Sequence, residues 1–517
     1  MTPLPNTHLH DELAQSKDRI TVDTKYGTVK GRRARNGAGV FLEVPYALPP
    51  ARWEDPKALP EGHKYEEGKE YIREARYCAQ PKNDGQAEGK EFEDKVGFGA
   101  PSENPLFLNI VIPPSFLNTS SPLLPVQVYI HGGFLQFGSP HGLGHQAQYL
   151  CARQGKQVVR VDIGYRLSVF GFLASKEQGL TGNYGFKDQW VALQWTRDNI
   201  RSFGGDPENV QVIGLSAGAH SVHQLLHHAS HLPDGQPAPF VSAIMQSNAI
   251  AFTPKTPAEY QSQYNALCTA VGLDPSDPST LGTLKDPTKV PASKLCELIE
   301  NDNLGEVYHG TFRGAFDASW VPVDTDMMEY QRSGGLARNL LRKGVRHAVI
   351  GDLTEEWYLY SIAHEPIKTK EDVKANLMRY YRKSEVDSMM VGREESTQGG
   401  WQRTFGEILS DWQVHLPVRK FAADMIKAGF PVLRYLIKWT PEAGREAVEG
   451  YVTHGTDYSI WHYRLPVLEQ GDVQIADAWL DRIDEELGKI DKREDLASMR
   501  VLTLKEDKTI EWDADAI

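Results

Sequence analysis

The chain of 517 residues carries 56 Lys and Arg against 69 Asp and Glu, which gives a net charge of −13, and it contains only four cysteines. An acidic chain of this kind is a poor candidate for a nucleic-acid-binding protein, because such proteins hold the phosphate backbone with clustered Lys and Arg. Four cysteines in a chain this long also exclude a disulfide scaffold, and their spacing matches no structural zinc site.

Short apolar runs rich in β-branched residues recur along the chain and predict strands. Several of these runs are apolar on both faces, as strands of a covered sheet are. The predicted strands span 20–33, as a hairpin around Tyr26 and Gly27, then 106–113, 126–130, 157–166, 209–214, 241–247, 347–353, 431–439 and, as a closing hairpin, 501–512.

Amphipathic helical patterns lie between these strands. They are clearest at 188–203, 372–383 and 418–429, and Gly429 followed by Pro431 is a typical stop signal for the last of them. Strands that alternate with helices are typical of an α/β fold rather than of a sandwich or a bundle. We therefore expect a large, mostly parallel central sheet covered by helices, with a small antiparallel hairpin near the N-terminus.

The sequence shows no targeting or membrane segment. The first thirty residues carry charges throughout and contain no apolar run of seven or more, so they do not indicate a secretory signal. No window approaches the 18 consecutive apolar residues that a membrane helix needs. We expect a cytoplasmic protein without an integral membrane segment.

The segment NVQVIGLSAGAHSV places a G-x-S-x-G pentapeptide, from Gly214 to Gly218, between a predicted strand and a helical pattern. In that setting the pentapeptide is a nucleophile elbow, because glycines two residues on either side of the serine permit the tight turn that exposes its hydroxyl. Short Gly/Ser patterns also arise by chance, so the strand before this pentapeptide and the helix after it are what support its interpretation as an elbow. Ser216 is the candidate nucleophile.

A second glycine-rich segment, HGGFLQFGS at 131–139, directly follows the predicted strand 126–130. Backbone N–H groups of such a loop can turn toward a reacting carbonyl and, with the amide after the nucleophile, stabilise a developing oxyanion. A lone Gly-Gly pair would be an ordinary turn, but upstream of an elbow it becomes a specific signal.

With these motifs the chain resembles the type-B carboxylesterases, the α/β-hydrolase family that includes the cholinesterases and related lipases. The resemblance covers roughly residues 20 to 465 and follows, in order, FLEVPYALPPARW, SENPLFLNIVIP, YIHGGFLQFGS, YRLSVFGFL, the segment from GNYGFKDQW to GLSAGAHSV, AIMQS, GDLTEEW and THGTDY. So many motifs in one order argue strongly against a chance match. The resemblance implies an α/β-hydrolase fold and the hydrolysis of carboxylic esters.

The resemblance also implies how the chain is organised. Residues 1–19 would be an N-terminal extension, and 20–517 a single α/β-hydrolase domain whose lid and gorge insertions lie mainly within 51–101 and 250–345. No internal repeat or long low-complexity linker marks a domain boundary. Because family members occur as monomers, dimers and tetramers, assembly stays open, and we expect a monomer or a homodimer.

An elbow of this type requires an acid and a histidine later in the chain, in that order. The family places its acid in a turn after a strand, and HAVIGDLTEEWYLY supplies both, which puts the acid at Glu356 and leaves Glu355 and Asp352 as alternatives. THGTD resembles the family's His-Gly-x-Asp/Glu loop and selects His454 from the 17 histidines.

The resemblance implies a Ser-Glu-His triad that needs no cofactor. His454 would take the proton of Ser216 as the serine attacks an ester carbonyl, Glu356 would hold the imidazole, and water would hydrolyse the acyl-enzyme. By the same correspondence, the amides that would form the oxyanion hole belong to Gly133, Phe134 and Ala217.

Some residues depart from the family pattern in ways that bear on the substrate. Phe134 replaces the usual third glycine, and its ring would restrict the acyl group. Leu215 replaces the Glu that commonly precedes the nucleophile, which disfavours a cationic, choline-like substrate. Trp357 stands where the family usually has Gly, so Leu215 and Trp357 are candidate pocket residues. We expect a neutral small-molecule ester or lactone as the substrate.

The cysteines depart from the family as well. Cys78 and Cys268 stand where family disulfides begin, but Pro105 and Thr283 occupy the places of the expected partners. A bridge between Cys268 and Cys296 stays open as a fallback. The loss of both family bridges supports a reducing compartment.

Two other residue pairs are not expected to take part in catalysis. Arg52 and Glu103 resemble the family's structural salt bridge. His223 and His227 share a helix face, as metal ligands would, but no Glu completes an H-E-x-x-H motif, so a packed or solvated helix face is the simpler interpretation. No metal is expected.

Two alternative functions stay open. The same triad could serve acyl transfer, thioester release or cyclisation in a biosynthetic pathway. A non-catalytic binding protein is less favoured, because the family's adhesion members have lost the triad whereas this chain keeps Ser216, Glu356 and His454. The expected partner is a small-molecule ester and not a nucleic acid.

Overall fold

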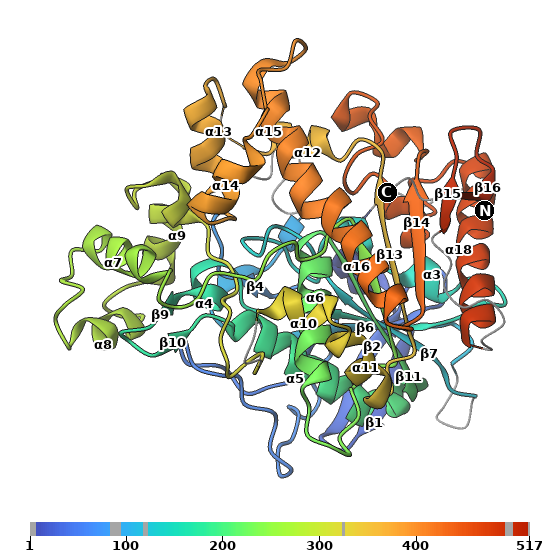
Figure 1. Ribbon diagram of the computed structural model, residues 1–517. Helices are drawn as coiled ribbons and strands as arrows, with labels where there is room; N and C mark the ends of the chain where they lie inside the picture. Colours follow the sequence, from blue (N-terminus) through green and yellow to red (C-terminus); the bar gives the residue numbers. More distant parts are fainter. Residues whose placement is uncertain are drawn as a thin grey trace.

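A computed structural model of the protein describes residues 7–82, 95–116, 122–322, 326–364, 366–491 and 500–514. At its centre lies a twelve-stranded mixed sheet (Figure 1). In spatial order its strands are β1 (Arg19–Thr24), β2 (Gly27–Arg33), β3 (Gly39–Pro45), β6 (Phe107–Ile112), β8 (Val159–Ile163), β7 (Leu124–Ile130), β11 (Gly205–Leu215), β12 (Ser242–Gln246), β13 (His347–Leu353), β14 (Val432–Ile437), β15 (Arg500–Leu504) and β16 (Ile510–Ala514). The pairs β4 (Arg76–Cys78) with β5 (Ala100–Ser102), and β9 (Ala174–Ser175) with β10 (Leu180–Thr181), form two small separate sheets.

The sheet is parallel through its middle and antiparallel toward both edges. From β8 to β15 every neighbouring pair is parallel. The pairings among β1, β2, β3, β6 and β8, and the last pairing of β15 with β16, are antiparallel. The expected α/β fold with a mostly parallel central sheet and antiparallel N-terminal strands is therefore confirmed.

Helices occupy the connections between the strands. In chain order they are α1 (Leu9–Gln15), α3 (Gln148–Cys151), α4 (Ser168–Phe172), α5 (Tyr184–Asn199), α6 (Ala217–Ser230), α7 (Gln261–Ala270), α8 (Thr280–Lys285), α9 (Ala292–Glu300), α10 (Met327–Arg332), α11 (Gly335–Arg342), α12 (Trp357–Ile362), α13 (Lys370–Leu377), α14 (Lys383–Met389), α15 (Gly400–Ser410), α16 (Leu416–Lys427), α17 (Tyr458–Trp461) and α18 (Gln470–Asp491). In Figure 1, α7, α8 and α9 form a lobe at the left, and α13 and α15 lie at the top.

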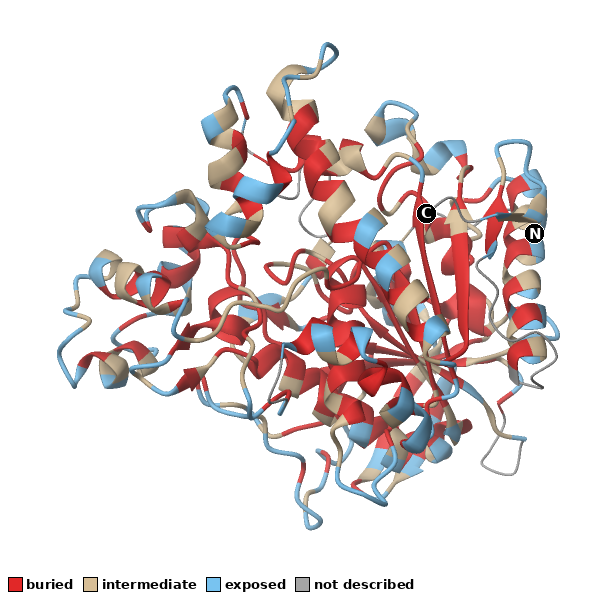
Figure 2. Ribbon diagram, in the orientation of Figure 1, coloured by how far each residue is buried: buried red, intermediate tan, exposed pale blue. Residues whose placement is uncertain are grey.

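Both faces of the central strands are buried, as Figure 2 shows in red. Successive side chains of a strand point to opposite faces, so Val128 and Val212 join one apolar cluster while their neighbours Tyr129 and Ile213 join another. Helices α5, α6 and α16 supply the first cluster. Helix α18 closes the second with Trp479, which is fully buried. This two-sided burial explains why the strands are apolar throughout.

The sequence-based strands are all present, and one predicted helix is too long. The helix expected at 372–383 corresponds to α13, which ends at Leu377, and α14 begins only at Lys383. At the start of α14 the Glu385 carboxylate accepts a hydrogen bond of 2.7 Å from the backbone N–H of Arg382. This contact caps a new helix start, so the chain turns between the two segments.

Strand β3 and helix α18 are absent from the sequence-based prediction. Strand β3 is nearly all buried and joins the N-terminal hairpin to the central sheet. Its pattern is hard to identify because it contains Glu43, which has a φ of 59° where the register with β6 shifts. Helix α18 is long but carries many acidic residues, which makes it resemble a solvated segment.

Arg52 connects the long excursion after β3 to the lobe at the left of Figure 1. The Arg52 guanidinium binds the Glu103 carboxylate through two nitrogens, one of them at 2.7 Å. Its remaining nitrogen donates to the carbonyls of Leu284 and Val290 at 2.6 and 2.9 Å. Arg52 and Glu103 thus hold loops together.

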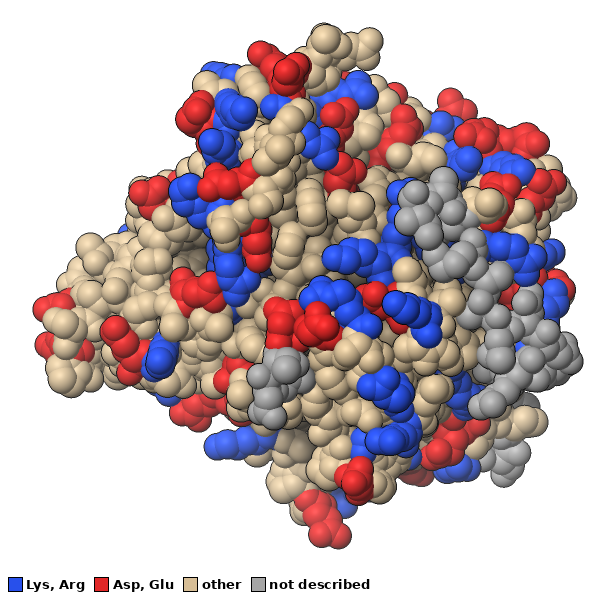
Figure 3. All heavy atoms as spheres, in the orientation of Figure 1, with Lys and Arg blue, Asp and Glu red and all other residues tan. Residues whose placement is uncertain are grey.

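Charged side chains of both signs are intermingled on the face shown in Figure 3. That face presents no broad basic field of the kind that binds a phosphate backbone. None of the helices in the described ranges combines the length and apolar character needed to cross a membrane.

Candidate active site

Ser216 lies at the sharp turn between β11 and α6. Its φ of 59° and ψ of −124° are unusual for a residue with a side chain. The turn is held on both sides, because Ser216 N–H donates to the Gln246 carbonyl of β12 at 2.8 Å and the Ser216 carbonyl accepts from His220 N–H at 3.0 Å. The strained turn presents the serine at the end of the sheet, as an elbow requires.

The two flanking glycines are required by close backbone contacts. A Cβ on Gly214 would lie 2.2 Å from the carbonyl carbon of Gly218, and a Cβ on Gly218 would lie 2.0 Å from the Ile130 oxygen of β7. Neither contact is possible for a real side chain. The glycines therefore let α6 start directly against β7 and β11.

The glycine-rich loop after β7 passes directly beside the serine. A Cβ on Gly132 would lie 2.9 Å from the Leu215 oxygen and 3.1 Å from the Ser216 Cβ. Gly133 has a φ of 107°, and Phe134 has a φ of 56° despite its side chain. The loop thus adopts the left-handed conformation at both positions, and Phe134 does so with the strain of a non-glycine residue.

Three backbone amides beside the serine are free to bind an anion. Among the described residues, no acceptor receives a hydrogen bond from the N–H of Gly133 or Phe134. Ala217 is the first residue of α6, so its N–H has no acceptor within the helix. Free N–H groups at a helix start and in an adjacent loop can stabilise negative charge on an oxygen bound near Ser216.

Glu356 and His454 lie in contact, although 98 residues separate them. The Glu356 Oε2 atom accepts a hydrogen bond of 2.6 Å from His454 Nδ1, and its Oε1 accepts one of 3.0 Å from Leu353 N–H at the end of β13. Both oxygens of this fully buried carboxylate are therefore occupied. His454 Nε2 is buried and has no hydrogen-bond partner within the described ranges.

The two alternative acids after β13, Glu355 and Asp352, are bonded to residues other than His454. The Glu355 Oε2 atom accepts from Val452 N–H at 2.8 Å. Asp352 binds Arg434 at 2.6 Å and His415 at 2.7 Å, and against the opposing effect of burial these partners keep the pKa of Asp352 below its usual value. Neither carboxylate is bonded to His454 in the structure, whereas Glu356 is.

Asp457, three residues after His454, is a further buried carboxyl that the sequence analysis leaves without a role. Burial, followed by the nearby negative charge of Glu356, raises the pKa of Asp457 to about 7. Its Oδ2 accepts from Trp461 Nε1 at 3.0 Å, and its Oδ1 has no partner in the described part of the chain. The last position of the His-Gly-x-Asp/Glu loop was the signal that could have identified it.

Ser216 and His454 line one pocket of about 270 Å³ together with the glycine-rich loop. Its apolar wall consists of Phe134, Phe137, Leu215, Leu359, Ile362, Val448 and Tyr458. Leu215 is one of the residues that line this pocket. Trp357 is not among the lining residues, because its ring packs against Tyr451 and under the Arg403 guanidinium.

The Phe134 ring closes one side of this pocket. It is 5% exposed, and its centroid lies 6.0 Å from the rings of Tyr360 and His364 and 6.4 Å from Tyr380. Tyr360 in turn lies 5.5 Å from the His454 ring. An aromatic wall therefore stands beside the serine, and the sequence did not predict its members apart from Phe134.

The histidines of α6 are packed into the protein interior. His223 accepts from Ile250 N–H at 3.0 Å and contacts Gln331 Oε1 at 2.8 Å, and burial lowers its pKa to about 4. Burial also lowers the pKa of His227. No cluster of three or more His, Cys, Asp or Glu side chains suited to a metal ion occurs among the described residues.

The four cysteines are buried and none forms a disulfide. Cys78 accepts a hydrogen bond of 3.3 Å from Leu167 N–H in the core. Cys268 and Cys296, the fallback pair, are both free thiols.

Comparisons with known proteins indicate the family of this chain. The model of the Carboxylesterase family matches residues 18–483. An uncharacterized esterase/lipase of Schizosaccharomyces pombe is 30% identical over 491 residues, which covers 89% of this chain and 86% of the relative. A carboxylic ester hydrolase of Gibberella moniliformis is 31% identical and covers 81% and 78% of the two chains.

A bacterial relative and a solved structure extend the comparison. A para-nitrobenzyl esterase of Bacillus subtilis is 30% identical over 358 residues, 69% of this chain and 67% of the relative. A solved PNB esterase structure superposes with a TM-score of 0.73 over 96% of this chain and 98% of its own, at 24% identity. At that identity the superposition supports the fold.

Proposed function

This chain belongs to the carboxylesterase family, and from that premise we propose that it is a carboxylic ester hydrolase that forms an acyl-enzyme on Ser216. The proposed substrate is an ester or lactone of a neutral small molecule. The observation that carries the proposal is the 2.6 Å contact between Glu356 and His454 Nδ1, which leaves His454 Nε2 open in the pocket that Ser216 lines.

In the proposed reaction His454 Nε2 takes the proton of the Ser216 hydroxyl while the serine oxygen attacks the ester carbonyl. The buried Glu356 carboxylate fixes the tautomer that carries its proton on Nδ1 and stabilises the imidazolium that forms. His454 then gives the proton to the leaving alcohol. In the second half of the reaction, His454 takes a proton from water as the water attacks the acyl-enzyme. The proton then passes to the Ser216 oxygen, and the acid is released.

The negative charge of the tetrahedral intermediate would be stabilised by backbone amides. The proposed donors are the N–H groups of Gly133, Phe134 and Ala217, which bind no acceptor in the described part of the chain and lie beside Ser216. Such prearranged donors typically contribute about 10²–10³ each to kcat.

The wall of the pocket argues against a cationic substrate. No Asp or Glu is among its described lining residues, and Leu215 presents an apolar side chain next to the nucleophile. A cationic substrate would lose its hydration here without gaining a carboxylate partner. A neutral, fairly hydrophobic ester meets no such cost.

The test is hydrolysis of para-nitrophenyl acetate and butyrate by the wild type and by Ser216→Ala. We expect the variant to lose activity by a factor of roughly 10⁴ or more, with an unchanged melting temperature. Ser221→Ala is the matched control, because that buried serine lies in the same helix, donates to the Ala217 carbonyl at 3.0 Å, accepts from Gln189 at 3.1 Å and does not line the pocket. Equal activity of Ser216→Ala and the wild type would exclude the proposal.

Hydrolysis is to be separated from acyl transfer in the same assay. Adding a primary alcohol as a competing acceptor and measuring free acid against new ester gives the partition of the acyl-enzyme. We expect free acid to dominate at low alcohol concentration. Exclusive transfer would favour the biosynthetic alternative.

A further inference from the structure

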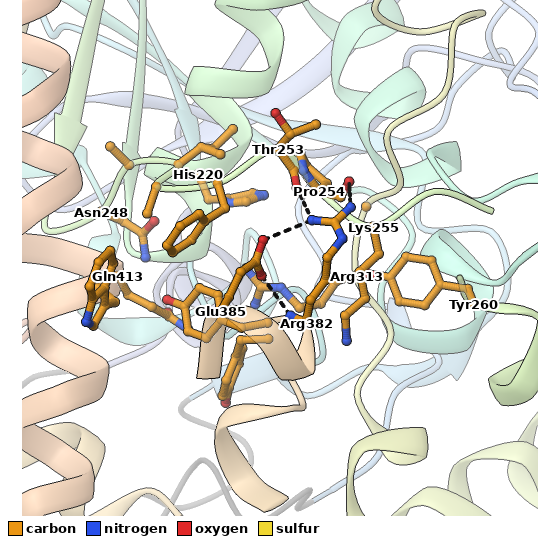
Figure 4. A pocket seen from close by; sticks show the side chains of 18 residues that line it. His220, Asn248, Thr253, Pro254, Lys255, Tyr260, Arg313, Arg382, Glu385 and Gln413 are labelled. Atoms are coloured by element: carbon orange, nitrogen blue, oxygen red, sulfur yellow. Dashed lines mark hydrogen bonds and ion pairs between the residues drawn. The ribbon is translucent and has the colours of Figure 1, made fainter. Parts of the chain in front are cut away.

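A second pocket, shown in Figure 4, is lined by residues other than those of the catalytic pocket. Tyr380, whose ring lies 6.4 Å from that of Phe134, is part of its lining. So is His220, one helical turn after Ser216 in α6, whose backbone N–H donates to the Ser216 carbonyl. The Phe134 ring, which lines the catalytic pocket, therefore lies next to the Tyr380 ring, which lines the second pocket.

The second pocket has an excess of positive charge in an otherwise acidic protein. Lys255, Arg313 and Arg382 line it, against one lining carboxylate, Glu385. Glu259 adds a second carboxylate nearby, bound to Arg382 at 2.6 Å. Three cations against two carboxylates leave one positive charge uncompensated, while the whole chain has a net charge of −13.

All hydrogen-bonding nitrogens of the Arg382 guanidinium have partners within the protein. Its guanidinium binds the Glu259 and Glu385 carboxylates and donates to the carbonyls of Thr253 and Pro254 at 2.8 and 3.0 Å, as the dashed lines to the last three residues show in Figure 4. Every nitrogen of Arg382 is used.

Unlike Arg382, Arg313 has no carboxylate or carbonyl partner among the described residues. Within the described ranges no carboxylate lies in ion-pair distance of Arg313, and its guanidinium donates no hydrogen bond. It stacks over the Tyr380 ring at 5.1 Å, which orients the planar group. A half-buried guanidinium with five unused donors is arranged to receive an anion.

Two neighbours of Arg313 can add to the binding of an anion. Lys255 Nζ donates to the Met378 carbonyl at 3.0 Å, and burial together with Arg382 lowers the pKa of Lys255 to about 8. The His220 side chain is 8% exposed and lines the same pocket, and neither ring nitrogen has a hydrogen-bond partner among the described residues. Both therefore have donors left for a ligand.

We propose that this second pocket binds a small organic carboxylate, held by the Arg313 guanidinium with Lys255 and His220 beside it. A guanidinium fork matches the two oxygens of a carboxylate. The cavity is small, about 50 Å³, which limits the ligand to a short-chain acid, and Tyr260, Tyr381 and Trp412 supply aromatic walls. The acid released from an ester at Ser216 is a ligand of this class; that link rests on the proposed function, but the site does not.

The test is calorimetric titration of sodium propionate into the full-length protein at constant ionic strength. Arg313→Gln should weaken propionate binding about tenfold, as the loss of a charge-assisted bidentate contact does, and Arg313→Lys should retain part of it. Arg403→Gln is the matched control, because that arginine stacks on Trp357 away from this pocket. Propionamide, which has the same shape without the charge, should not bind.

Several outcomes would overturn the proposal. They are equal propionate affinity of Arg313→Gln and the wild type, no saturable propionate binding to the wild type, equal binding of propionamide, and tighter binding of inorganic phosphate than of propionate. Ser216→Ala should bind propionate as the wild type does. Loss of esterase activity with intact propionate binding would affect only the proposed function, and the reverse would affect only this site.

Discussion

At the scale of single residues, the choice among three neighbouring acids is the sharpest distinction that the structure makes. Glu356→Gln keeps the shape of the side chain but presents an amide to His454 Nδ1, so the imidazole loses its charged partner. We expect kcat for para-nitrophenyl butyrate to fall about 10³–10⁴-fold with little change in KM.

Glu355→Gln is the control for that variant, because its carboxylate accepts from Val452 N–H and does not touch His454. We expect it to keep kcat within a few-fold of the wild type. Equal losses in the two variants would show that Glu356 has no special role.

Phe134 should set the size of the acyl group. Phe134→Gly removes a ring that is packed against Tyr360 and Tyr380 and replaces a strained residue at a φ of 56° with one that adopts this angle freely. We expect kcat/KM for octanoyl relative to acetyl para-nitrophenyl esters to rise about tenfold or more. An unchanged ratio across the acyl series would contradict this role.

Asp457 should make stability depend on pH. Its pKa of about 7 in the folded protein lies above the usual 3.8, so the folded state holds a proton that the unfolded state releases as the pH rises above 4. Its contribution to stability is present at pH 4 and is lost progressively up to pH 7, at about 1.4 kcal/mol per pKa unit.

Asp457→Asn removes this loss while its side-chain oxygen can still accept from Trp461. The melting temperature of the variant should therefore rise relative to the wild type between pH 4 and pH 7 and stay higher above that range. A parallel pH dependence of the two proteins would show that Asp457 is ionised throughout. Asp198→Asn, at an exposed carboxylate, serves as the control and should show no such trend.

At the scale of elements, the elbow depends on the approach of α6 to β7. Gly218→Ala would place a Cβ 2.0 Å from the Ile130 oxygen, which only a shift of the helix could relieve. We expect loss of soluble protein or a fall of several degrees in melting temperature, together with loss of activity.

Gly488→Ala provides the opposite case. That glycine lies on the exposed side of α18, with no atom within 4 Å of an added Cβ, so alanine should stabilise the helix by up to about 1 kcal/mol.

A Gly218→Ala protein that has the melting temperature and the activity of the wild type would contradict the close packing of α6 against β7.

Elements also show how far the sequence could predict this fold. The strands were predictable because burial on both faces makes them apolar runs, and the elbow was predictable because its glycines and serine are fixed by backbone geometry. Strand β3 was missed because Glu43 interrupts its apolar run, and α18 because acidic residues fill its outer side.

Members of the proposed site could be predicted where they stand in a sequence motif. Residues that only side-chain packing brings to the site could not be predicted. His454 and Ser216 stand in motifs. The resemblance points to Glu356 as the acid but leaves Glu355 and Asp352 open, and of these three only Glu356 contacts His454 in the structure. The role of Trp357 could not be predicted, because α12 directs its ring toward Tyr451 and away from the pocket. Arg313 follows no motif at all.

At the scale of the whole molecule, the thiols give a test of the expected reducing compartment. All four cysteines are buried and free, and burial raises the pKa of Cys151 and of Cys296 to about 12. We expect a disulfide reagent such as DTNB to react with four thiols in denaturant without reductant, and only slowly in the native protein. Fewer than four thiols in denaturant would reveal a bridge and count against a cytoplasmic location.

The central claim is that Ser216 is a nucleophile activated by His454 and Glu356, and covalent labelling tests it most directly. The full-length protein is treated with a fluorophosphonate, its intact mass is measured, and the labelled peptide is sequenced. We expect one adduct per chain, on Ser216, with labelling slowed strongly in His454→Ala. A folded protein that takes no adduct, or that takes it on a residue other than Ser216, would contradict the account.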